Sequence, residues 1–227
     1  MSTPTVFIAG ASRGLGLEFA RQYAIAGWRV IAGVRNPLKA SELMRVKGAE
    51  VVPLDVTSAN AIAGAAWHAD EAPLDLLIIN AGVYGPDTTQ FAAPGDDDFN
   101  RVMHTNVLGP MRLIQVFGDA VAQARGKIVA LSSGMGSIAN TGAGDHVVYR
   151  ASKAALNMVV QAAAQSYGPR GATVISLSPG WVKTDMGGAS APQEAYDSVR
   201  AMRATIEAAG EAEQGAFLNY DGKRIAW

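Results

Sequence analysis

The chain of 227 residues contains no cysteine, and this absence excludes several kinds of chemistry. It cannot form disulfide bonds, use a catalytic thiolate or hold zinc through cysteine. A composition without cysteine is compatible with the cytoplasmic location that we expect for this protein. Histidine is also scarce. His68, His104 and His146 are not paired at the spacing of metal ligands, so we expect no metal site.

The sequence has neither a strong net charge nor a long hydrophobic run. Its formal net charge is -1 and no basic stripe occurs, so we do not expect a nucleic-acid partner. A membrane span needs about 20 consecutive apolar residues. No stretch of the chain approaches this length, so we expect no membrane partner. The segment Met1–Pro4, which precedes the first apolar run, lacks the features of a signal peptide.

Short apolar runs alternate with helical segments along the whole chain. Runs such as Leu76–Ile79 are apolar at consecutive positions, which is typical of strands covered on both faces of a parallel sheet. The pattern predicts a single α/β domain over residues 1–227, a Rossmann-type doubly wound parallel sheet flanked by helices on both faces. The expected strands are Thr5–Ala9, Trp28–Ala32, Glu50–Leu54, Leu74–Ile79, Lys127–Leu131, Thr173–Leu177 and Ala216–Asn219. The expected helices are Gly14–Ala26, Leu38–Lys47, Ser58–Ala69, Phe99–Ala124, Tyr149–Tyr167 and Glu194–Ala209.

A glycine-rich turn follows the first expected strand and opens a helix. Glycine lets the backbone approach a ligand closely, and the free N–H groups of a helix N-terminus attract anions. The turn therefore predicts a site for the phosphates of a dinucleotide, and the alternative is a turn that binds nothing. The expected cofactor-binding residues of the turn are Gly10, Ser12, Arg13, Gly14, Leu15 and Gly16.

The end of the second expected strand indicates which dinucleotide is preferred. Folds that prefer NAD usually place an acidic residue there to hold the ribose 2′-hydroxyl. No acidic residue occurs between Phe19 and Ser41, and Arg35 stands at this position instead. Together with Arg13, its guanidinium suits a 2′-phosphate. We therefore expect NADP(H) to be preferred and NAD(H) to be possible, unless both arginines are merely solvated surface residues.

Tyr149 and Lys153 are four residues apart, which places them one turn apart on the same face of a helix. A nearby ammonium favours the phenolate and lowers a tyrosine pKa, so this pair is a candidate proton donor and acceptor. Upstream, Ser132 and Ser133 follow an expected strand, where ligands bind in open α/β sheets. A hydroxyl at this position can stabilise charge on a substrate oxygen. The alternatives are a surface Tyr–Lys contact and a pair of turn serines.

Taken in order, these features resemble the classical short-chain dehydrogenase/reductase family over nearly the whole chain. Asn106, within Thr105–Gly109, matches the catalytic asparagine of the family. Further matches are Asp55 and Val56 in the segment that meets adenine, Asn80, Ala81 and Gly82 in the N-A-G motif, and Pro179, Gly180, Val182 and Thr184 in the stretch that contacts nicotinamide. The sequence around Ser133 and Tyr149 is similar to the C-factor and sniffer subgroup, whose members include carbonyl reductases and proteins of cell–cell signalling.

The resemblance implies a role for each catalytic residue. Tyr149 passes the proton, and Lys153 lowers the tyrosine pKa and holds the nicotinamide ribose. Ser133 orients the substrate oxygen, with Ser132 and Ser137 as alternates because the gap to Tyr149 is longer than usual. Asn106 positions a water. The implied reaction moves hydride between NADP(H) and a small carbonyl or alcohol. A sensor that binds the dinucleotide without turnover is the alternative.

Two further expectations concern partners and access to the site. The helix Tyr149–Tyr167 has small or apolar residues on every face, so we expect it to pack against a second subunit in a homodimer or homotetramer. Burial within the domain is the alternative. The segment of about residues 185–194 is short and rich in glycine and alanine, which predicts a short substrate loop and an open site.

Overall fold

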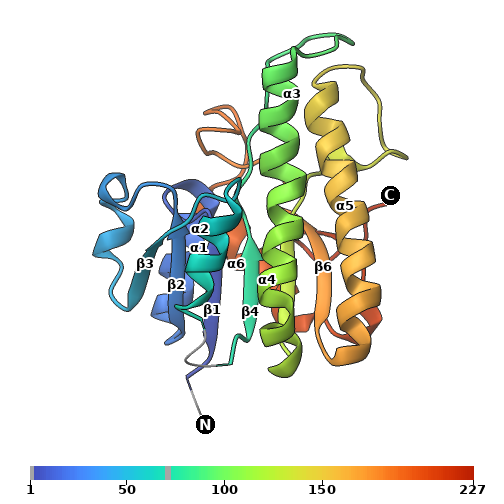
Figure 1. Ribbon diagram of the computed structural model, residues 1–227. Coiled ribbons are helices and arrows are strands. Elements are labelled where there is room, and N and C mark those ends of the chain that lie inside the picture. The colour runs from blue at the N-terminus through green and yellow to red at the C-terminus, as the bar shows by residue number, and fades with distance from the viewer. Residues whose placement is uncertain (1–2, 70–72) are drawn as a thin grey trace.

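The computed structural model describes residues 3–69 and 73–227 and has at its centre one parallel sheet (Figure 1). Met1 and Ser2, at the start of the segment without signal-peptide features, lie outside the described residues. The sheet has seven strands in the order β3-β2-β1-β4-β5-β6-β7. Their bounds are β1 Thr5–Ala9, β2 Arg29–Val34, β3 Ala49–Pro53, β4 Leu76–Ile79, β5 Lys127–Leu131, β6 Thr173–Ser178 and β7 Phe217–Asn219. This confirms the expected doubly wound α/β fold.

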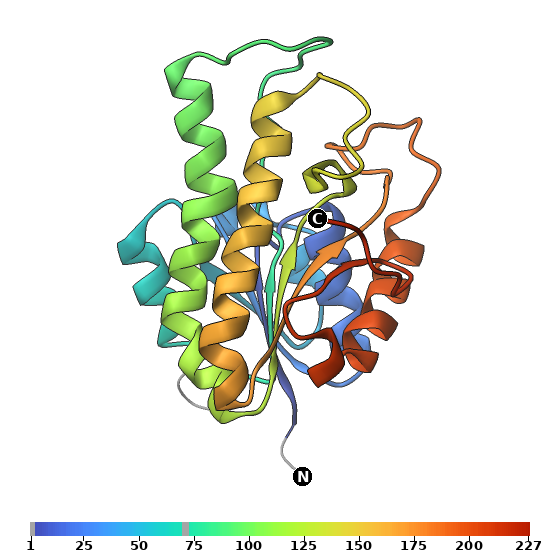
Figure 2. The same ribbon diagram turned by 90° about the vertical axis from the view of Figure 1, so that its right-hand side faces the viewer.

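Helices cover both faces of the sheet (Figures 1 and 2). The helices α2 Ala59–Ala66, α4 Gly109–Gln123 and α5 Val147–Tyr167 pack on one face, and α1 Gly14–Ile25 and α6 Ala195–Ala208 pack on the other. The helix α3 Asp96–Met103 continues through a π-helical turn, His104–Leu108, into α4. No helix in the described part of the chain is long and apolar enough to cross a membrane.

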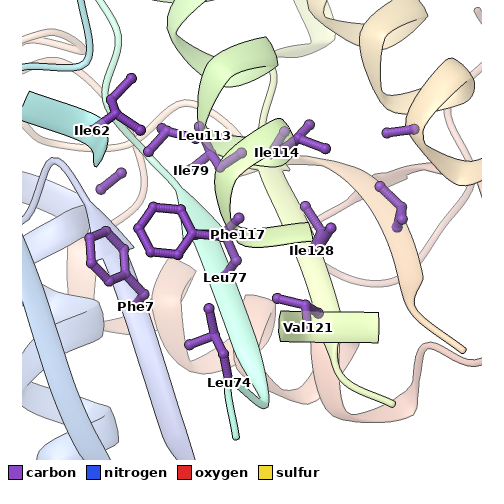
Figure 3. Close-up of a cluster of buried hydrophobic side chains, with 14 of the residues drawn as sticks. Phe7, Ile62, Leu74, Leu77, Ile79, Leu113, Ile114, Phe117, Val121 and Ile128 are labelled. Carbon is purple, nitrogen blue, oxygen red and sulfur yellow. The ribbon is translucent and has the colours of Figure 1, made fainter. Parts of the chain in front are cut away.

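The strands are buried on both faces because their consecutive apolar side chains alternate between two cores. Phe7 and Leu77 point toward α4, where Phe117 lies with its ring centroid 4.5 Å from that of Phe7 (Figure 3). Val6 and Ile8, the neighbours of Phe7, belong to the opposite core with α1 and α6. Each fully buried side chain of this size contributes about 1.5–3 kcal/mol to stability. This continuous burial explains why the strands lack polar alternation.

Two expected helices differ from the structure. The expected helix Leu38–Lys47 is absent, and two single 3₁₀ turns, Pro37–Lys39 and Leu43–Arg45, occupy the region instead. Asn36 caps the first of these turns by accepting a hydrogen bond from the Leu38 N–H at 3.1 Å. The expected helix Phe99–Ala124 begins earlier, at Asp96, because three aspartates in the first turn favour a helix N-terminus there.

The helix α5 is not buried on every side within the chain. Leu156, Val160 and Ala164 are buried in the core, whereas Met158 is exposed with 69% of its surface accessible. Ala151 and Ala162 are also exposed. One side of α5 is thus apolar and uncovered by the described residues, and the alternative of complete burial within the domain does not hold.

Candidate active site

A cavity of about 710 Å³ lies at the carboxyl ends of the strands. This is where ligands bind in open α/β sheets. The expected site residues that line it are Gly10, Ser12, Arg13, Gly14, Leu15, Arg35, Asp55, Val56, Asn80, Ala81, Gly82, Tyr149, Lys153, Pro179 and Thr184. Gly16, Gly180 and Val182 support its walls, and Asn106 and Ser133 lie beside lining residues. The structure therefore brings the expected residues together around one cavity.

The glycine turn is shaped by close backbone packing against the segment after β4. Strands β1 and β4 are paired with Ala9 opposite Ile79, so Gly10 and Asn80 emerge side by side. The Asn80 side-chain amide donates to the Gly10 carbonyl oxygen at 2.6 Å. Gly10 has a φ of +92°, and a Cβ there would lie 2.8 Å from the Ala81 Cα. At Gly16 a Cβ would overlap the Gly10 carbonyl oxygen. The turn is thus a cradle of bare backbone at a helix N-terminus, which fits a dinucleotide pyrophosphate.

Two arginines line the cavity. Arg13 lies in the glycine turn and immediately precedes α1, and Arg35 immediately follows β2. Near Arg35, the Asp55 carboxylate accepts hydrogen bonds from the Thr57 hydroxyl at 2.7 Å and the Thr57 N–H at 2.9 Å. The Thr57 hydrogen bonds, followed by the charge of Arg35, hold the Asp55 pKa below its ordinary value. Each of the two guanidinium groups is suited to a phosphate.

The Tyr149 hydroxyl is buried and is hydrogen-bonded to the Ser133 side chain. Burial raises the Tyr149 pKa to about 12, and the Ser133 hydrogen bond only partly opposes this effect. Lys153 lies one helical turn away, with its ammonium nitrogen 5.7 Å from the Tyr149 ring centroid. Desolvation by burial is the largest effect on this hydroxyl, and the role of Lys153 in lowering the Tyr149 pKa stays a prediction.

Lys153 is itself buried beside the end of β5. Its ammonium donates to the Leu131 carbonyl oxygen at 2.8 Å. Burial lowers the Lys153 pKa to about 8, since a charged group loses its hydration there. Lys153 is therefore a buried cation that lines the cavity. Its ammonium loses its proton, and with it its charge, near pH 8.

The three candidate serines have different partners. The Ser133 side chain is bonded to the Tyr149 hydroxyl and also accepts from the Met135 N–H at 3.2 Å. Ser132 borders the cavity, but its hydroxyl donates to the Asn157 side chain at 2.7 Å. Ser137 is buried and its hydroxyl donates to the Ala226 carbonyl oxygen at 2.6 Å. Of the three, Ser133 has the position that action on the same substrate oxygen as Tyr149 requires.

Asn106 lies in the π-helical turn between α3 and α4 and is fully buried. Its side chain accepts from the Val83 N–H at 2.9 Å and donates to the Val83 carbonyl oxygen at 2.8 Å. The same amide nitrogen lies 3.0 Å from the Ser152 hydroxyl oxygen. In this structure Asn106 therefore holds the segment after the N-A-G motif against α5. The π-turn, a feature frequent at functional sites, aims its side chain there.

The stretch from Pro179 to Thr184 forms the remaining wall. Gly180 has a φ of +79°, and a Cβ there would meet the Gln193 side chain at 2.8 Å. Val182 is buried and pairs with Gln193 in an isolated bridge. Thr184 reaches the glycine turn, because a Cβ on Gly14 would lie 3.4 Å from its methyl group. The loop after β6 thus folds back beside the mouth of the cavity.

Several residues at the site were not identified from the sequence. The Tyr84 ring lies 4.5 Å from the Tyr149 ring, centroid to centroid, and 4.9 Å from the His146 ring. Arg101, His104 and Asp185 line the cavity as well. These side chains come from loops and from the end of α3, where no periodic pattern indicates which way a residue faces. Within the described residues, no group of acidic, histidine or cysteine side chains could hold a metal ion.

Comparison with known proteins relates the chain to dehydrogenases and reductases. A family model described as short chain dehydrogenase matches residues 4–195. The C-signal of Myxococcus xanthus is 39% identical over 159 residues, covering 68% of this chain and 93% of that protein. The carbonyl reductase Sniffer of D. melanogaster superposes with a TM-score of 0.92 at 28% identity, and NADPH-bound carbonyl reductase from chicken fatty liver with 0.87 at 33% identity. Both superpositions cover 100% of each chain.

Proposed function

Because this chain belongs to the short-chain dehydrogenase family, we propose that it is an NADP(H)-dependent carbonyl reductase. It transfers hydride between the nicotinamide and a small carbonyl or alcohol substrate. The observation that carries the proposal is the buried Tyr149 hydroxyl, hydrogen-bonded to Ser133 and one helical turn from the Lys153 ammonium, at the wall of the cavity. Solved carbonyl reductases that share the fold contain NADP or NADPH, which supports the cofactor.

Each catalytic residue has a defined task in this proposal. When bound, the nicotinamide supplies the hydride that reaches the carbonyl carbon. Tyr149 donates a proton from its hydroxyl to the carbonyl oxygen, which becomes the alcohol. Ser133 orients that oxygen from beside Tyr149. Lys153 places a positive charge below the site, and Asn106 fixes the segment that follows Gly82.

The raised pKa of Tyr149 keeps its hydroxyl protonated. A general acid must carry its proton at the working pH. Burial raises the Tyr149 pKa to about 12, so the hydroxyl is protonated throughout the neutral range. Oxidation of an alcohol would need the phenolate, which this environment disfavours. Tyr149 is therefore in the protonation state that a proton donor to a carbonyl oxygen requires.

The cofactor-binding residues divide by the part of NADP(H) that they serve. The turn residues Gly10, Ser12, Gly14, Leu15 and Gly16 take the pyrophosphate, and Arg13 and Arg35 take the 2′-phosphate. Asp55 and Val56 lie near the adenine. The residues Asn80, Ala81, Gly82, Tyr149, Lys153, Pro179, Gly180, Val182 and Thr184 take the nicotinamide half. NAD(H) lacks the 2′-phosphate and therefore binds more weakly.

A sensor that binds the dinucleotide without turnover is not favoured. Such a protein has no need for a proton donor, yet Tyr149 and Lys153 are both present, buried and joined to the cavity. The similar protein C-signal has a name that refers to signalling. A signalling role alone would not explain why this chain has the side chains of a proton donor. The intact proton-donor set supports the enzyme.

Turnover with a panel of reactive aldehydes, ketones and quinones tests the proposal. Loss of NADPH absorbance is followed for the natural protein and for Tyr149→Phe. We expect the variant to bind NADPH within about two-fold of the natural protein but to lose about 10²- to 10⁴-fold in kcat, the usual contribution of a general acid. Equal turnover by the two proteins would remove Tyr149 as proton donor. NADPH binding without turnover across the panel would favour the sensor.

The preference for NADP(H) is tested separately with Arg35→Asp. The carboxylate removes one phosphate partner and repels the 2′-phosphate, so NADPH affinity is expected to fall at least about ten-fold, with NADH affinity unchanged or higher. Arg45→Asp is the matched control, since it makes the same charge change outside the cavity. Unchanged NADPH affinity in Arg35→Asp would remove Arg35 from the site.

The assembly and location of the protein stay predictions. The exposed apolar side of α5, with Met158 at its centre, supports association into a homodimer or homotetramer. Sedimentation of the natural protein and of Met158→Glu tests this, and we expect the charged variant to shift toward the monomer. A single domain with its substrate loop at about residues 185–194 and a cytoplasmic location complete the proposal.

A further inference from the structure

An ion pair joins the glycine turn to the loop that follows β6. The Arg13 guanidinium lies 2.7 Å from the Asp185 carboxylate. Both side chains line the cavity. They are also exposed, with 72% and 71% of their surfaces accessible. An ion pair as exposed as this one contributes little to the stability of the fold. Its effect therefore falls on any other ligand that Arg13 binds.

The loop that presents Asp185 is anchored at both ends. At its base, Val182 and Gln193 form a bridge, and the Lys183 N–H donates to the Gln193 carbonyl oxygen at 2.8 Å. Further along, the Thr184 hydroxyl oxygen accepts from the Gly187 N–H at 3.1 Å. Asp185 therefore lies in an ordered turn near the base of this loop. Its contact with Arg13 ties that turn to the glycine turn.

The two arginines that line the cavity are not equivalent. Arg13 is paired with Asp185, whereas Arg35 has no carboxylate within 4.0 Å among the ion pairs of residues 3–69 and 73–227. A phosphate bound by Arg13 would meet the Asp185 carboxylate on the guanidinium that it needs. Two anions on one cation repel each other, and the effect is strongest for the doubly charged phosphate.

We propose, building on the NADP(H) site above, that Asp185 is a specificity-determining residue that competes with the cofactor 2′-phosphate for Arg13. Binding of the phosphate displaces Asp185 and releases the turn that carries it from the glycine turn. A cofactor without this phosphate leaves the ion pair intact. The presence of the phosphate is thereby transmitted to the loop beside the substrate entrance.

Two fragments of the cofactor isolate the effect, because neither contains the nicotinamide half that would touch the loop directly. Adenosine 2′,5′-bisphosphate has the 2′-phosphate and adenosine 5′-phosphate lacks it. Calorimetry measures the affinity of each for the natural protein and for Asp185→Asn. We expect the variant to bind the bisphosphate about two- to five-fold more tightly, the range of an exposed ion pair, and to bind the monophosphate unchanged.

The control variant is Glu194→Gln, which removes one negative charge from the same loop. Glu194 is paired with Lys183 at 2.5 Å, is exposed and does not line the cavity. It should leave both affinities unchanged. Comparison of Arg13→Ala with Arg13→Ala/Asp185→Asn then tests the route through Arg13. The effect of Asp185→Asn should vanish when Arg13 is absent.

Hydrogen exchange supplies a second readout. The bisphosphate, but not the monophosphate, should speed exchange in the peptide that spans residues 183–188 by about two- to five-fold, the range of an exposed ion pair, and Asp185→Asn should show the same faster exchange without ligand. The proposal is overturned if Asp185→Asn changes both affinities equally or neither, or if its effect persists without Arg13. If the natural protein does not bind the bisphosphate at all, the NADP(H) assignment fails with it. If the bisphosphate binds the natural protein and Asp185→Asn with the same affinity, only this inference is overturned.

Discussion

The Tyr84 ring packs on the Tyr149 ring with their centroids 4.5 Å apart and their planes tilted by 41°. On its other side Tyr84 meets the His146 ring, and its hydroxyl reaches the Met135 sulfur at 3.6 Å. Tyr84 thus fixes the orientation of the ring that carries the hydroxyl proposed as proton donor. Its own position is set by the N-A-G segment that Asn106 holds.

The packing of Tyr84 predicts a difference between two substitutions. Tyr84→Phe keeps the ring and should retain kcat within about two-fold. Tyr84→Leu removes the aromatic contact, which is worth about 0.5–1.5 kcal/mol, and should lower kcat about two- to ten-fold. Steady-state kinetics with one carbonyl substrate compare the variants. Equal losses in both would assign the effect to the hydroxyl instead of the ring.

The pH dependence of reduction should report Lys153. Its pKa is about 8, so the ammonium is charged below this pH and neutral above it, whereas Tyr149, with a pKa of about 12, keeps its proton across the same range. We expect kcat/KM, which reflects groups of the free enzyme, to be steady near pH 6–7 and to fall as pH rises through about 8. Lys153→Met should be much less active and should lack this step. A step retained in the variant would belong to another group.

Lys153 should also lower the stability of the fold. A pKa of about 8 in place of 10.5 corresponds to about 3 kcal/mol of unfavourable burial, and the hydrogen bond to Leu131 returns about 1 kcal/mol. Lys153→Met should therefore raise the free energy of unfolding by about 2 kcal/mol at pH 7.

The sign of the pH effect on stability follows from the two states. Below pH 8 both folded and unfolded chains carry the Lys153 proton, and the penalty is fully present. Between pH 8 and 10.5 only the unfolded chain binds the proton, so the stability of the natural protein rises with pH. Urea titrations should show that the difference in free energy of unfolding between Lys153→Met and the natural protein becomes smaller as pH rises from about 8 to 10.5. An advantage that grows with pH, or a loss of stability at pH 7, would contradict the assignment.

Gly10 should tolerate no side chain. Gly10→Ala places a methyl 2.8 Å from the Ala81 backbone at a φ of +92°, and we expect a loss of about 1–3 kcal/mol in stability together with weaker NADPH binding. Gly27→Ala is a matched control, because Gly27 has a φ of +81° but nothing within 4 Å of an added Cβ. Gly27→Ala should lose stability but bind NADPH as tightly as the natural protein. Thermal unfolding and NADPH titration separate the two effects.

Much of the site followed from the sequence because its determinants are local. The spacing of Tyr149 and Lys153 on one helix fixes their common face, and the strand ends place Gly10 and Asn80 at the same edge of the sheet. The positions of the strands could be predicted because their consecutive apolar residues are buried on both faces of the sheet. The segment 38–47 did not follow, since its helical composition was overruled by a capped turn at Asn36 and Pro37.

The sequence by itself determined the parallel sheet, the glycine turn after its first strand and the common helix face of Tyr149 and Lys153, since these depend on periodicity and on spacing along one element. Only the tertiary structure decided that Ser133, and not Ser132, meets Tyr149, that Tyr84 packs on it, and that Asp185 reaches Arg13. It also decided the sign of the Tyr149 pKa shift. Burial and contacts between loops distant in the chain set these features, and neither leaves a repeating signal in the order of residues.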